Sequence, residues 1–158
     1  MLSWLRRQVG QFAFSAVAMA VRAMLSPVAF GVSAIIVDET GKVALVRHSY
    51  THGWLLPGGG VARGEAAEAA ILRELREELG TVRSDPPRLF GIYTRPAGWA
   101  TNVIALYCLT NAQVEFRRSL EVRELIFVDP NALPGDVGAG ALRRLAEYIG
   151  KAPPSPFW

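Results

Sequence analysis

Short apolar runs separated by polar, turn-forming stretches recur along the chain and predict β-strands. Residues 30–37 and 43–46 are two such runs, both rich in β-branched side chains, and they flank the polar segment 38–42. This arrangement predicts a β-hairpin in which Gly41 adopts a positive φ at low cost, because glycine has no Cβ. Further apolar runs predict strands at residues 88–94, 102–109, 114–117 and 125–128.

Two other segments have the composition of helices. Residues 65–79 form an unbroken stretch rich in Ala, Leu, Glu and Arg, and Gly80 follows at the position expected of a helix C-cap. A second helix is predicted at residues 138–149, whereas residues 48–63 are glycine-rich and loop-like. Strands that flank a central helix and are followed by another helix predict a layered α/β fold, but the local pattern does not give the strand order.

The first 29 residues form a separate apolar segment, which Pro27 interrupts because proline lacks an amide hydrogen and clashes with the preceding helical turn. We predict a helix over residues 2–25. At about 100° per residue, polar side chains gather on one face of this helix and apolar ones on the rest, so the helix is amphipathic. The polar face consists of Arg7, Gln8, Gln11, Ser15, Arg22 and Ser26.

Length and composition are those of one globular domain. The chain has 158 residues, of which 51% are hydrophobic and 20% charged, which excludes a chain that is mainly disordered. We therefore expect an N-terminal amphipathic helix within residues 1–29, a single domain at 30–150 and a Pro-rich tail at 151–158. The single cysteine, Cys108, lies in an apolar run, which predicts a core thiol and neither a disulfide nor a zinc site.

The formal net charge of +3 comes from the N-terminal segment. Residues 1–30 contain Arg6, Arg7 and Arg22 and no acidic residue, and in the rest of the chain basic and acidic residues are equal in number. A cationic, apolar segment suits an anionic membrane surface better than DNA. We therefore expect no sequence-specific nucleic-acid partner.

Three glutamates on the predicted helix 65–79 carry the clearest chemistry. Glu74 precedes Glu77 and Glu78 by three and four positions, so the three carboxylates crowd together and need a compensating cation. Carboxylate ligation selects a hard ion, Mg²⁺ or alternatively Mn²⁺, which also binds phosphate oxygens. The preceding segment 57–60, Pro-Gly-Gly-Gly, lets the backbone approach a ligand closely. The simpler alternative is a solvated acidic face held by neighbouring arginines.

The spacing of these residues resembles the Nudix box. Gly59 is followed after five residues by Glu65, after seven more by Arg73-Glu74-Leu75, and then by Glu77-Glu78 and Gly80. The resemblance covers residues 59–81 and departs from the family pattern at Thr81, where the family usually has an aliphatic residue. It implies an α/β fold, specifically a Nudix-like α/β/α sandwich with a mixed sheet.

The resemblance also implies an activity, namely cleavage of a pyrophosphate bond in a nucleoside diphosphate derivative by a Mg²⁺-dependent cytoplasmic enzyme. Pro96 lies fifteen residues after Thr81, a spacing that resembles that of members acting on ADP-ribose. A nucleotide sugar is a related substrate. The alternatives are a nucleoside triphosphate pyrophosphohydrolase and a non-catalytic regulatory or binding protein. An isomerase on the same scaffold would use a reactive cysteine, for which Cys108 is poorly placed.

By resemblance, the box residues divide into two groups. Glu74, Glu77 and Glu78 would hold the divalent metal, and Glu77 would thereby belong to the catalytic set as well. Arg73 and Glu65 would orient the loop and the helix against each other. These roles come from the family and not from the spacing alone.

Residues outside the three glutamates complete the predicted site. Glu121 is our hypothesis for the general base, because it precedes the penultimate strand, and Glu124 is the alternative. Gly58, Gly59 and Trp54 are assigned to ligand binding. Aromatic rings on which a base could stack are Trp54, Tyr93 and Trp99. His48 is expected to be an exposed loop histidine rather than a phosphate ligand.

Three interpretations compete for the N-terminal segment. Its arginines and its apolar face suit the anionic surface of the inner membrane, with contact through residues 1–26. Arg6-Arg7 followed by an apolar stretch and Ala18-Met19-Ala20 also has features of a signal peptide, although Arg22 follows the supposed cleavage site. The third interpretation is packing on the protein's own domain or on a second copy, as in a homodimer.

Overall fold

The computed structural model describes residues 17–158. Residues 17–25 are helical, and regular elements follow through the rest of this range. In chain order they are β1 (Val28–Ile36), β2 (Val43–His48), α2 (Ala67–Leu79), β3 (Gly80–Arg83), β4 (Arg88–Ala97), β5 (Ala100–Leu109), β6 (Gln113–Phe116), β7 (Val122–Val128) and α3 (Ala139–Tyr148). All six predicted strands and the two predicted helices of the domain are therefore present, and residues 17–25 of the predicted N-terminal helix are helical.

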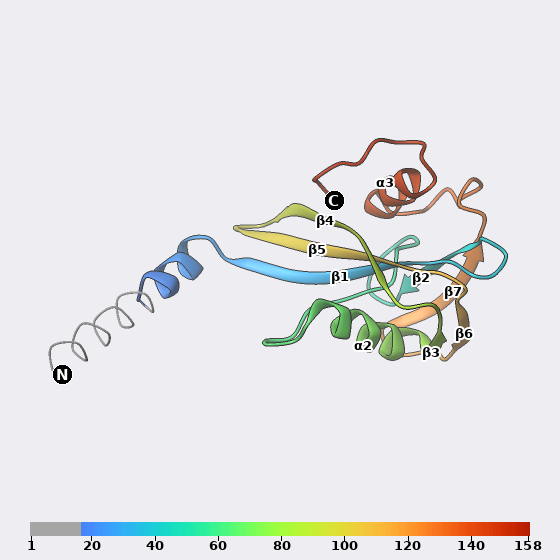
Figure 1. Cartoon of the computed structure of the whole chain (residues 1–158), viewed down its shortest axis with the longest axis horizontal. Helices are drawn as coiled ribbons and strands as arrows, with labels where there is room; N and C mark the ends of the chain where they lie inside the picture. The colour runs from blue at the N-terminus through green and yellow to red at the C-terminus, as the bar shows by residue number, and fades with distance from the viewer. Residues whose placement is uncertain (1–16) are drawn as a thin grey trace, which may run out of the picture.

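The strands form one mixed sheet and two small antiparallel pairs. In the mixed sheet β5 lies in the middle, parallel to β1 and antiparallel to β4. β2 pairs with β7, and β3 pairs with β6. Figure 1 shows α2 on one side of this arrangement and α3 on the other. The structure thus confirms the predicted layered α/β sandwich with a mixed sheet.

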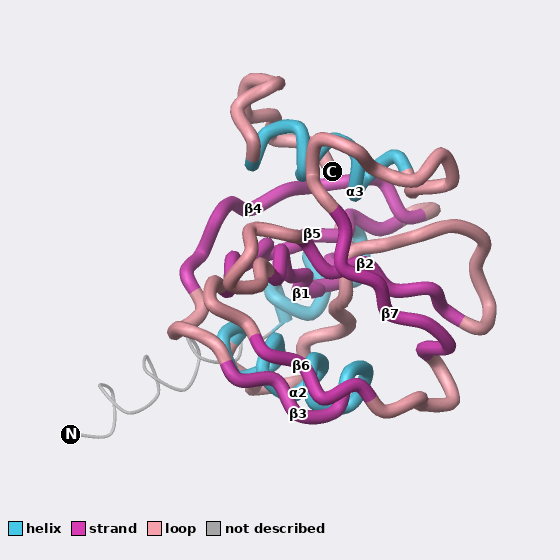
Figure 2. The backbone as a smooth tube through the Cα atoms, turned by 90° about the vertical axis from the view of Figure 1, so that its right-hand side faces the viewer, coloured by secondary structure: helices cyan, strands magenta, loops and turns pink. Residues whose placement is uncertain are grey.

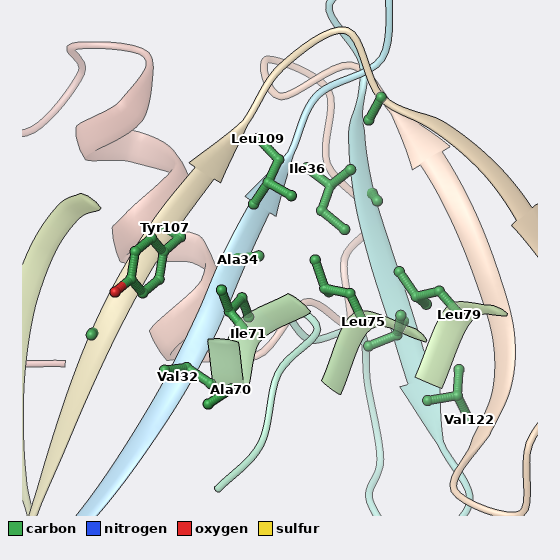
Figure 3. Close-up of a cluster of buried hydrophobic side chains, with 14 residues drawn as sticks. Val32, Ala34, Ile36, Ala70, Ile71, Leu75, Leu79, Tyr107, Leu109 and Val122 are labelled. Atoms are coloured by element: carbon green, nitrogen blue, oxygen red, sulfur yellow. The ribbon is translucent and has the colours of Figure 1, made fainter. Parts of the chain in front are cut away.

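The core consists of two layers of side chains, one on each face of the strands. Successive residues of a strand point to opposite faces, so Ala34 and Ile36 of β1 pack toward α2, whereas Ile35 packs toward α3. Figure 3 shows the layer beneath α2, where Ile71, Leu75 and Leu79 of the helix meet the strands. Because both faces are covered, residues 32–37 are buried without interruption.

Helix α2 begins and ends close to the predicted positions. It starts at Ala67, two residues after the predicted start, and its N-cap Ala66 makes no side-chain capping hydrogen bond. Gly80 ends the helix with φ +90°, a backbone conformation that glycine adopts readily, and its N–H donates to the Arg76 carbonyl oxygen. The prediction that Gly80 is the C-cap is therefore confirmed.

The predicted hairpin between residues 30–37 and 43–46 is wrong in its pairing. The turn is present, with Gly41 at φ +82°, but only Val37 and Val43 form a bridge. Beyond that bridge β1 pairs with β5 and β2 pairs with β7. Most residues of the two strands are buried, and each strand pairs over its length with one strand that lies far away in the sequence.

Two differences from the sequence pattern involve other strands. β3 directly follows α2 and was not predicted, since its four residues are too few for a clear periodicity. β4 and β5 are longer than predicted and form a hairpin closed by the pair Ala97 and Ala100. Trp99 lies at this turn and is 82% exposed.

The two ends of the described chain differ in their contacts. Residues 17–26 are exposed throughout, and Figure 1 shows this helical stretch standing apart from the sandwich. The predicted residues 2–16 of that helix lie outside the described range. Within the described range, no helix is long and apolar enough to span a bilayer. Residues 151–158 instead turn back along the sandwich, and the backbone view in Figure 2 shows them beside α3.

Candidate active site

Arg73 connects the glycine-rich loop to α2. Its Nε donates to Glu65 Oε1 at 2.9 Å, and its Nη2 donates to Glu65 Oε2 and to the Gly60 carbonyl oxygen, both at 2.9 Å. Its Nη1 donates to Glu74 Oε1 at 2.8 Å and to Glu77 Oε2 at 3.2 Å. One guanidinium therefore fixes the loop, the start of the helix and two of the three box glutamates relative to each other.

Glu65 is the residue whose charge this arrangement stabilises most. The hydrogen bonds from Arg73, together with one from the Ala62 N–H, lower the pKa of Glu65 to about 2. The same contacts raise the pKa of Arg73. Both side chains are consequently ionised over the whole physiological pH range, and their pairing holds loop 60–65 against the helix.

Glu78 is in the opposite situation, because it lies on the buried stripe of α2 at only 3% exposure. Its Oε2 accepts a hydrogen bond from the Gly58 N–H at 2.9 Å, and its Oε1 lies 3.4 Å from His48 Nε2. Burial raises the pKa of Glu78 to about 8, against the lowering effect of Gly58, and the charges of Glu74 and Glu121 raise it further. No lysine or arginine in the part of the chain that the structure describes forms a salt bridge with this carboxylate.

His48 was expected to be an exposed loop residue, and this expectation is wrong. It is the last residue of β2, it is 7% exposed, and its ring packs edge-on against Tyr50 with centroids 5.1 Å apart. Burial lowers its pKa, against the raising effect of Glu121. The alternation of β2 would have indicated this position, because Val46 also faces α2. With His48 and Glu78 both favoured in their neutral forms, their contact is not an ion pair.

The two glycines before the box allow the close approach between loop and helix. Gly58 has φ +143°, and a Cβ there would overlap the Val32 carbonyl oxygen. A Cβ on Gly59 would overlap the Glu74 carboxylate. The loop is also paired with β1, since the Val32 N–H donates to the Gly59 carbonyl oxygen at 2.9 Å. These glycines therefore place a carboxylate directly against backbone atoms.

The two candidates for the general base lie in different surroundings. Glu121 is exposed just before β7, and its charge acts on the pKa of three nearby groups, Glu78, His48 and Tyr50. Glu124 faces Arg47, whose Nη1 lies 3.4 Å from its Oε1, and Arg47 also contacts Asp136 at 2.9 Å. Glu121 is therefore close enough to Glu78 for its charge to act on that box glutamate, whereas Glu124 pairs with Arg47.

Two of the three aromatic residues proposed for stacking are buried in the core. Trp54 is 6% exposed, and the guanidinium of Arg47 covers its ring at 4.3 Å from the centroid. Tyr93 is 4% exposed, and its hydroxyl donates to Glu147 Oε2 at 3.0 Å. Neither ring offers a free face to a base. For Trp54 this agrees with packing beside the box and not with ligand binding.

A cavity of about 690 Å³ lies beside the glycine loop, on the α3 side of β1. Its floor is formed by β1, β4 and β5, and its other walls by residues 55–60, the start of α3 and the last residue, Trp158. Sequence reasoning did not find Trp158, because a single aromatic residue in a Pro-rich tail carries no periodic signal. The cavity lies next to the box residues, since Gly59 touches both the cavity and Glu74.

The acidic residues suit a divalent cation by their chemistry. Their oxygen donors are the ligands that Mg²⁺ and Mn²⁺ prefer, and Glu78 has the raised pKa of a carboxylate that lacks a positive partner. Within residues 17–158, no three acidic, histidine or cysteine side chains are already gathered at metal-binding distances. Arg73 instead occupies oxygens of Glu74 and Glu77. The donor types therefore fit such an ion.

Comparison with known proteins agrees with this geometry. A family profile described as the NUDIX domain matches residues 27–150. A putative 8-oxo-dGTP diphosphatase of Bacillus subtilis is 32% identical over 104 residues, which are 66% of this chain and 68% of that protein. An Escherichia coli RNA pyrophosphohydrolase is 43% identical over 54 residues, 34% of this chain and 31% of that protein. The chain thus spans about a third of the second relative.

Solved structures show the same fold. A MutT protein from Methanosarcina mazei superimposes with a TM-score of 0.68 at 22% identity, over 80% of this chain and 95% of that one. A UDP-X diphosphatase superimposes with a TM-score of 0.63 at 22% identity, over 85% of this chain and 72% of that one. Together with the profile match, these findings show that the chain belongs to the Nudix hydrolase family.

Proposed function

We propose that this chain is a divalent-metal-dependent pyrophosphatase that cleaves a nucleoside diphosphate derivative. The observation that carries the proposal is the environment of Glu78. This carboxylate is 3% exposed, lies among other glutamates and has no lysine or arginine partner within the described residues. A buried carboxylate without a counter-charge is costly, and a bound cation removes that cost.

The metal would be held by Glu74, Glu77 and Glu78, with Mg²⁺ as the preferred ion and Mn²⁺ as the alternative. When bound, such an ion neutralises phosphate charge and makes a bound water more acidic. The donor set, the cavity of about 690 Å³ beside it and the glycine loop between them support this assignment. The intact set of glutamates also argues against a non-catalytic binding protein.

Arg73 and Glu65 are positioning residues in this proposal. Their two hydrogen bonds, both 2.9 Å long, fix the loop that precedes α2. Arg73 also holds oxygens of Glu74 and Glu77, so it keeps these carboxylates in place while they are not bound to a cation. Gly58 and Gly59 complete the arrangement, because their backbone contacts Glu78 and Glu74 directly.

Glu121 is the proposed general base. It is exposed, its charge acts on Glu78 and His48, and no side chain of the described residues forms a salt bridge with it. Glu124 is paired with Arg47 and is the weaker candidate. An accessible, unpaired carboxylate beside the metal ligands can accept the proton of an attacking water.

The substrate class has two candidates. The first is a nucleoside diphosphate derivative such as ADP-ribose or a nucleotide sugar. The second is a nucleoside triphosphate, which the name of the Bacillus subtilis relative favours. The two differ in their products: both release a nucleoside monophosphate, but a triphosphate also releases pyrophosphate and a diphosphate derivative releases the phosphorylated second group.

A substrate panel tests the proposal. Full-length protein is incubated with ADP-ribose, nucleotide sugars and nucleoside triphosphates, each with Mg²⁺, with Mn²⁺ and with excess chelator, and the products are separated. We expect release of a nucleoside monophosphate with either ion and none with chelator. The Glu78→Gln variant is the matched control for contaminating hydrolases. Hydrolysis that chelator leaves unchanged, or that Glu78→Gln retains in full, contradicts the proposal.

For the N-terminal segment we propose peripheral contact with the inner membrane surface, which places the enzyme in the cytoplasm. The support is the sequence of residues 1–26, with three arginines and no acid, and the exposure of the part that the structure describes. Met24 is 81% exposed and Leu25 is 79% exposed. Each basic residue near an anionic surface contributes about 1 kcal/mol to binding.

Liposome sedimentation tests this contact. Full-length protein is expected to sediment with vesicles containing anionic lipid and to be released as salt is raised. Neutralising Arg6, Arg7 and Arg22 together to Gln is expected to abolish sedimentation, whereas neutralising the exposed Arg63, Arg83 and Arg88 leaves it intact. If the protein ignores such vesicles and runs as a dimer in analytical ultracentrifugation, the segment serves self-association instead.

A further inference from the structure

The last residues of the chain form an additional strand-like pairing with the outer edge of β4. The Thr94 N–H donates to the Pro156 carbonyl oxygen at 2.9 Å, and the Trp158 N–H donates to the Thr94 carbonyl oxygen at 3.0 Å. Thr94 and Phe157 thus form a parallel bridge. Proline residues do not prevent this, because only the N–H groups of residues 94 and 158 are needed.

Buried groups of α3 hold this segment in place. Arg144 is 0% exposed, and its Nη1 donates to the Phe157 carbonyl oxygen at 2.6 Å. Its Nη2 donates to Glu147 Oε1 at 2.5 Å, and that oxygen also accepts the Ser155 N–H at 3.0 Å. Glu147 Oε2 accepts the Tyr93 hydroxyl at 3.0 Å. The segment is therefore attached through backbone groups, which leaves its side chains available for other contacts.

This attachment places the Trp158 ring between β4 and α3, with the Arg144 guanidinium 5.8 Å from the ring centroid. The ring meets Tyr93 edge-on with ring centroids 5.8 Å apart, at an interplanar angle of 74°. It also packs so closely over Gly140, in the first turn of α3, that a Cβ there would overlap the indole. Trp158 is half-buried and forms one wall of the 690 Å³ cavity, whereas the neighbouring Phe157 is 65% exposed and does not line it.

The cavity combines apolar and polar surfaces. Phe30, Leu55 and Ile104 contribute apolar side chains, and Arg95 and Asn102 contribute polar ones from β4 and β5. Residues 58–60 also line the cavity, and they contact two carboxylates of the box, since the Gly58 N–H donates to Glu78 and Gly59 lies against Glu74. A nucleobase needs this combination, namely an aromatic ring for stacking and a few polar groups at its edge.

We propose that Trp158 is a specificity-determining residue that stacks on the nucleobase of the substrate, with Arg95 and Asn102 at the edge of the base. The inference rests on the proposed function, because it places the phosphates at residues 58–60 and the base at the far end of the same cavity. The C-terminal segment 153–158 is then part of the substrate site. Its attachment to β4 and α3 orders the ring before the substrate binds.

Ligand binding without catalysis tests this inference. Affinities for AMP, GMP, CMP and UMP, and for ribose 5-phosphate, which lacks a base, are measured by calorimetry on full-length protein in chelator. Trp158→Leu and Trp158→Phe form a matched pair, since both retain an apolar side chain and only phenylalanine has an aromatic face. Phe157→Ala, on the exposed neighbour, controls for disturbance of the segment itself. Thermal unfolding of each variant shows whether the fold is retained.

We expect Trp158→Leu to weaken binding of the tightest mononucleotide by about 10-fold, within the range measured for stacking of a base on an aromatic ring. Trp158→Phe is expected to stay within about threefold of wild type. Phe157→Ala is expected to match wild type, and ribose 5-phosphate is expected to bind all variants alike. With a substrate from the panel, Trp158→Leu is expected to raise KM and leave kcat unchanged.

Unchanged mononucleotide binding by Trp158→Leu overturns the inference, as does an equal loss for mononucleotides and ribose 5-phosphate, which would assign a purely structural role to the ring. Absence of mononucleotide binding to wild type also overturns it. The proposed function fails separately. If wild type binds mononucleotides through Trp158 but hydrolyses nothing in the panel, the pyrophosphatase assignment is wrong and the base site stands.

Discussion

Helices α2 and α3 each carry an ionisable side chain in the protein interior, but the two are satisfied differently. Arg144 on α3 is 0% exposed and pairs with Glu147 and with the Phe157 carbonyl oxygen, while its guanidinium also covers the Tyr93 ring at 4.1 Å from the centroid. Glu78 on α2 is 3% exposed and has one hydrogen bond, from the Gly58 N–H.

The difference distinguishes a charge that the chain itself neutralises from one that we propose serves metal binding. Burying an ion is favourable only when opposite charge and hydrogen bonds surround it, as they do around Arg144. Burial raises the pKa of Glu78 to about 8, and the nearby charges of Glu74 and Glu121 act in the same direction. Strongly perturbed groups of this kind cluster at functional sites because a ligand supplies the missing interaction. The chain itself therefore compensates the charge on α3, and we expect a cation to compensate the one on α2.

Removal of a box carboxylate should produce the largest effect. Glu77→Gln or Glu78→Gln is expected to lower kcat with Mg²⁺ by about 10³-fold or more, because each removes a charged metal ligand. Thermal unfolding without metal should be unchanged or improved for Glu78→Gln, since the variant removes a buried acid. Steady-state kinetics and calorimetric unfolding measure both. Glu68→Gln, in the exposed first turn of α2, is the control. Near wild-type turnover would show that the metal assignment is wrong.

Glu121 and Glu124, the two candidates for the general base, also differ in their partners, because Arg47 forms a salt bridge with Glu124 and not with Glu121. Glu121→Gln is expected to reduce the rate by about 10²- to 10⁴-fold with little change in metal affinity, as for loss of a positioned base. Glu124→Gln, whose partner is Arg47, should change the rate by less than about threefold. Rates and Mg²⁺ affinity are measured for both variants. The reverse outcome would move the base to Glu124.

Disruption of the compensated charge on α3 should affect stability and not chemistry. Arg144→Met leaves Glu147 buried without its partner and is expected to lower the free energy of unfolding by about 3–5 kcal/mol. Urea unfolding measures the loss, and kcat of the protein that remains folded should change little. The double variant Arg144→Met with Glu147→Gln should recover part of the stability. A fully stable single variant would show that the pair contributes little.

The Glu65–Arg73 pair should give the smallest effect, and it depends on pH. The pKa of Glu65 in the folded protein is about 2, below the ordinary value of 4.5. The ionised carboxylate therefore stabilises the folded protein fully above about pH 4.5, and this stabilisation is lost as the pH falls toward 2. Glu65→Gln should unfold a few degrees below wild type at pH 7. The gap should narrow as pH falls below 4.5. Thermal scans across pH 3–8 measure it, and a gap that stays constant contradicts the assignment.

The sequence predicts the parts of this molecule whose causes are local. The C-cap at Gly80 and the placement of three glutamates on α2 follow from helix geometry and from residue types at fixed spacing. Pairing between strands does not. β1 lies beside β5, whose residues are more than 70 positions away, and nothing in either run specifies the other. Two consecutive apolar runs around a turn therefore predict a hairpin even where each strand pairs elsewhere.

Site residues divide in the same way. The interaction of Arg73 with Glu65 joins residues eight positions apart within one motif, so the family pattern indicates it. His48 comes from β2 and reaches Glu78 only because the two segments pack together, which no local pattern shows. Trp158 depends on an attachment through backbone atoms to Thr94, and backbone hydrogen bonds leave no mark on side-chain composition.

The glycine loop between the cavity and the box carboxylates has one further consequence. Gly59 lines the cavity, and the Glu74 carboxylate lies against it because glycine has no Cβ. Only one backbone segment therefore separates the cavity from this carboxylate. The spacing between the base end and the carboxylates is consequently set by main-chain geometry, which few substitutions can alter. Substitutions among the cavity side chains can therefore change the lining of the cavity without changing this spacing.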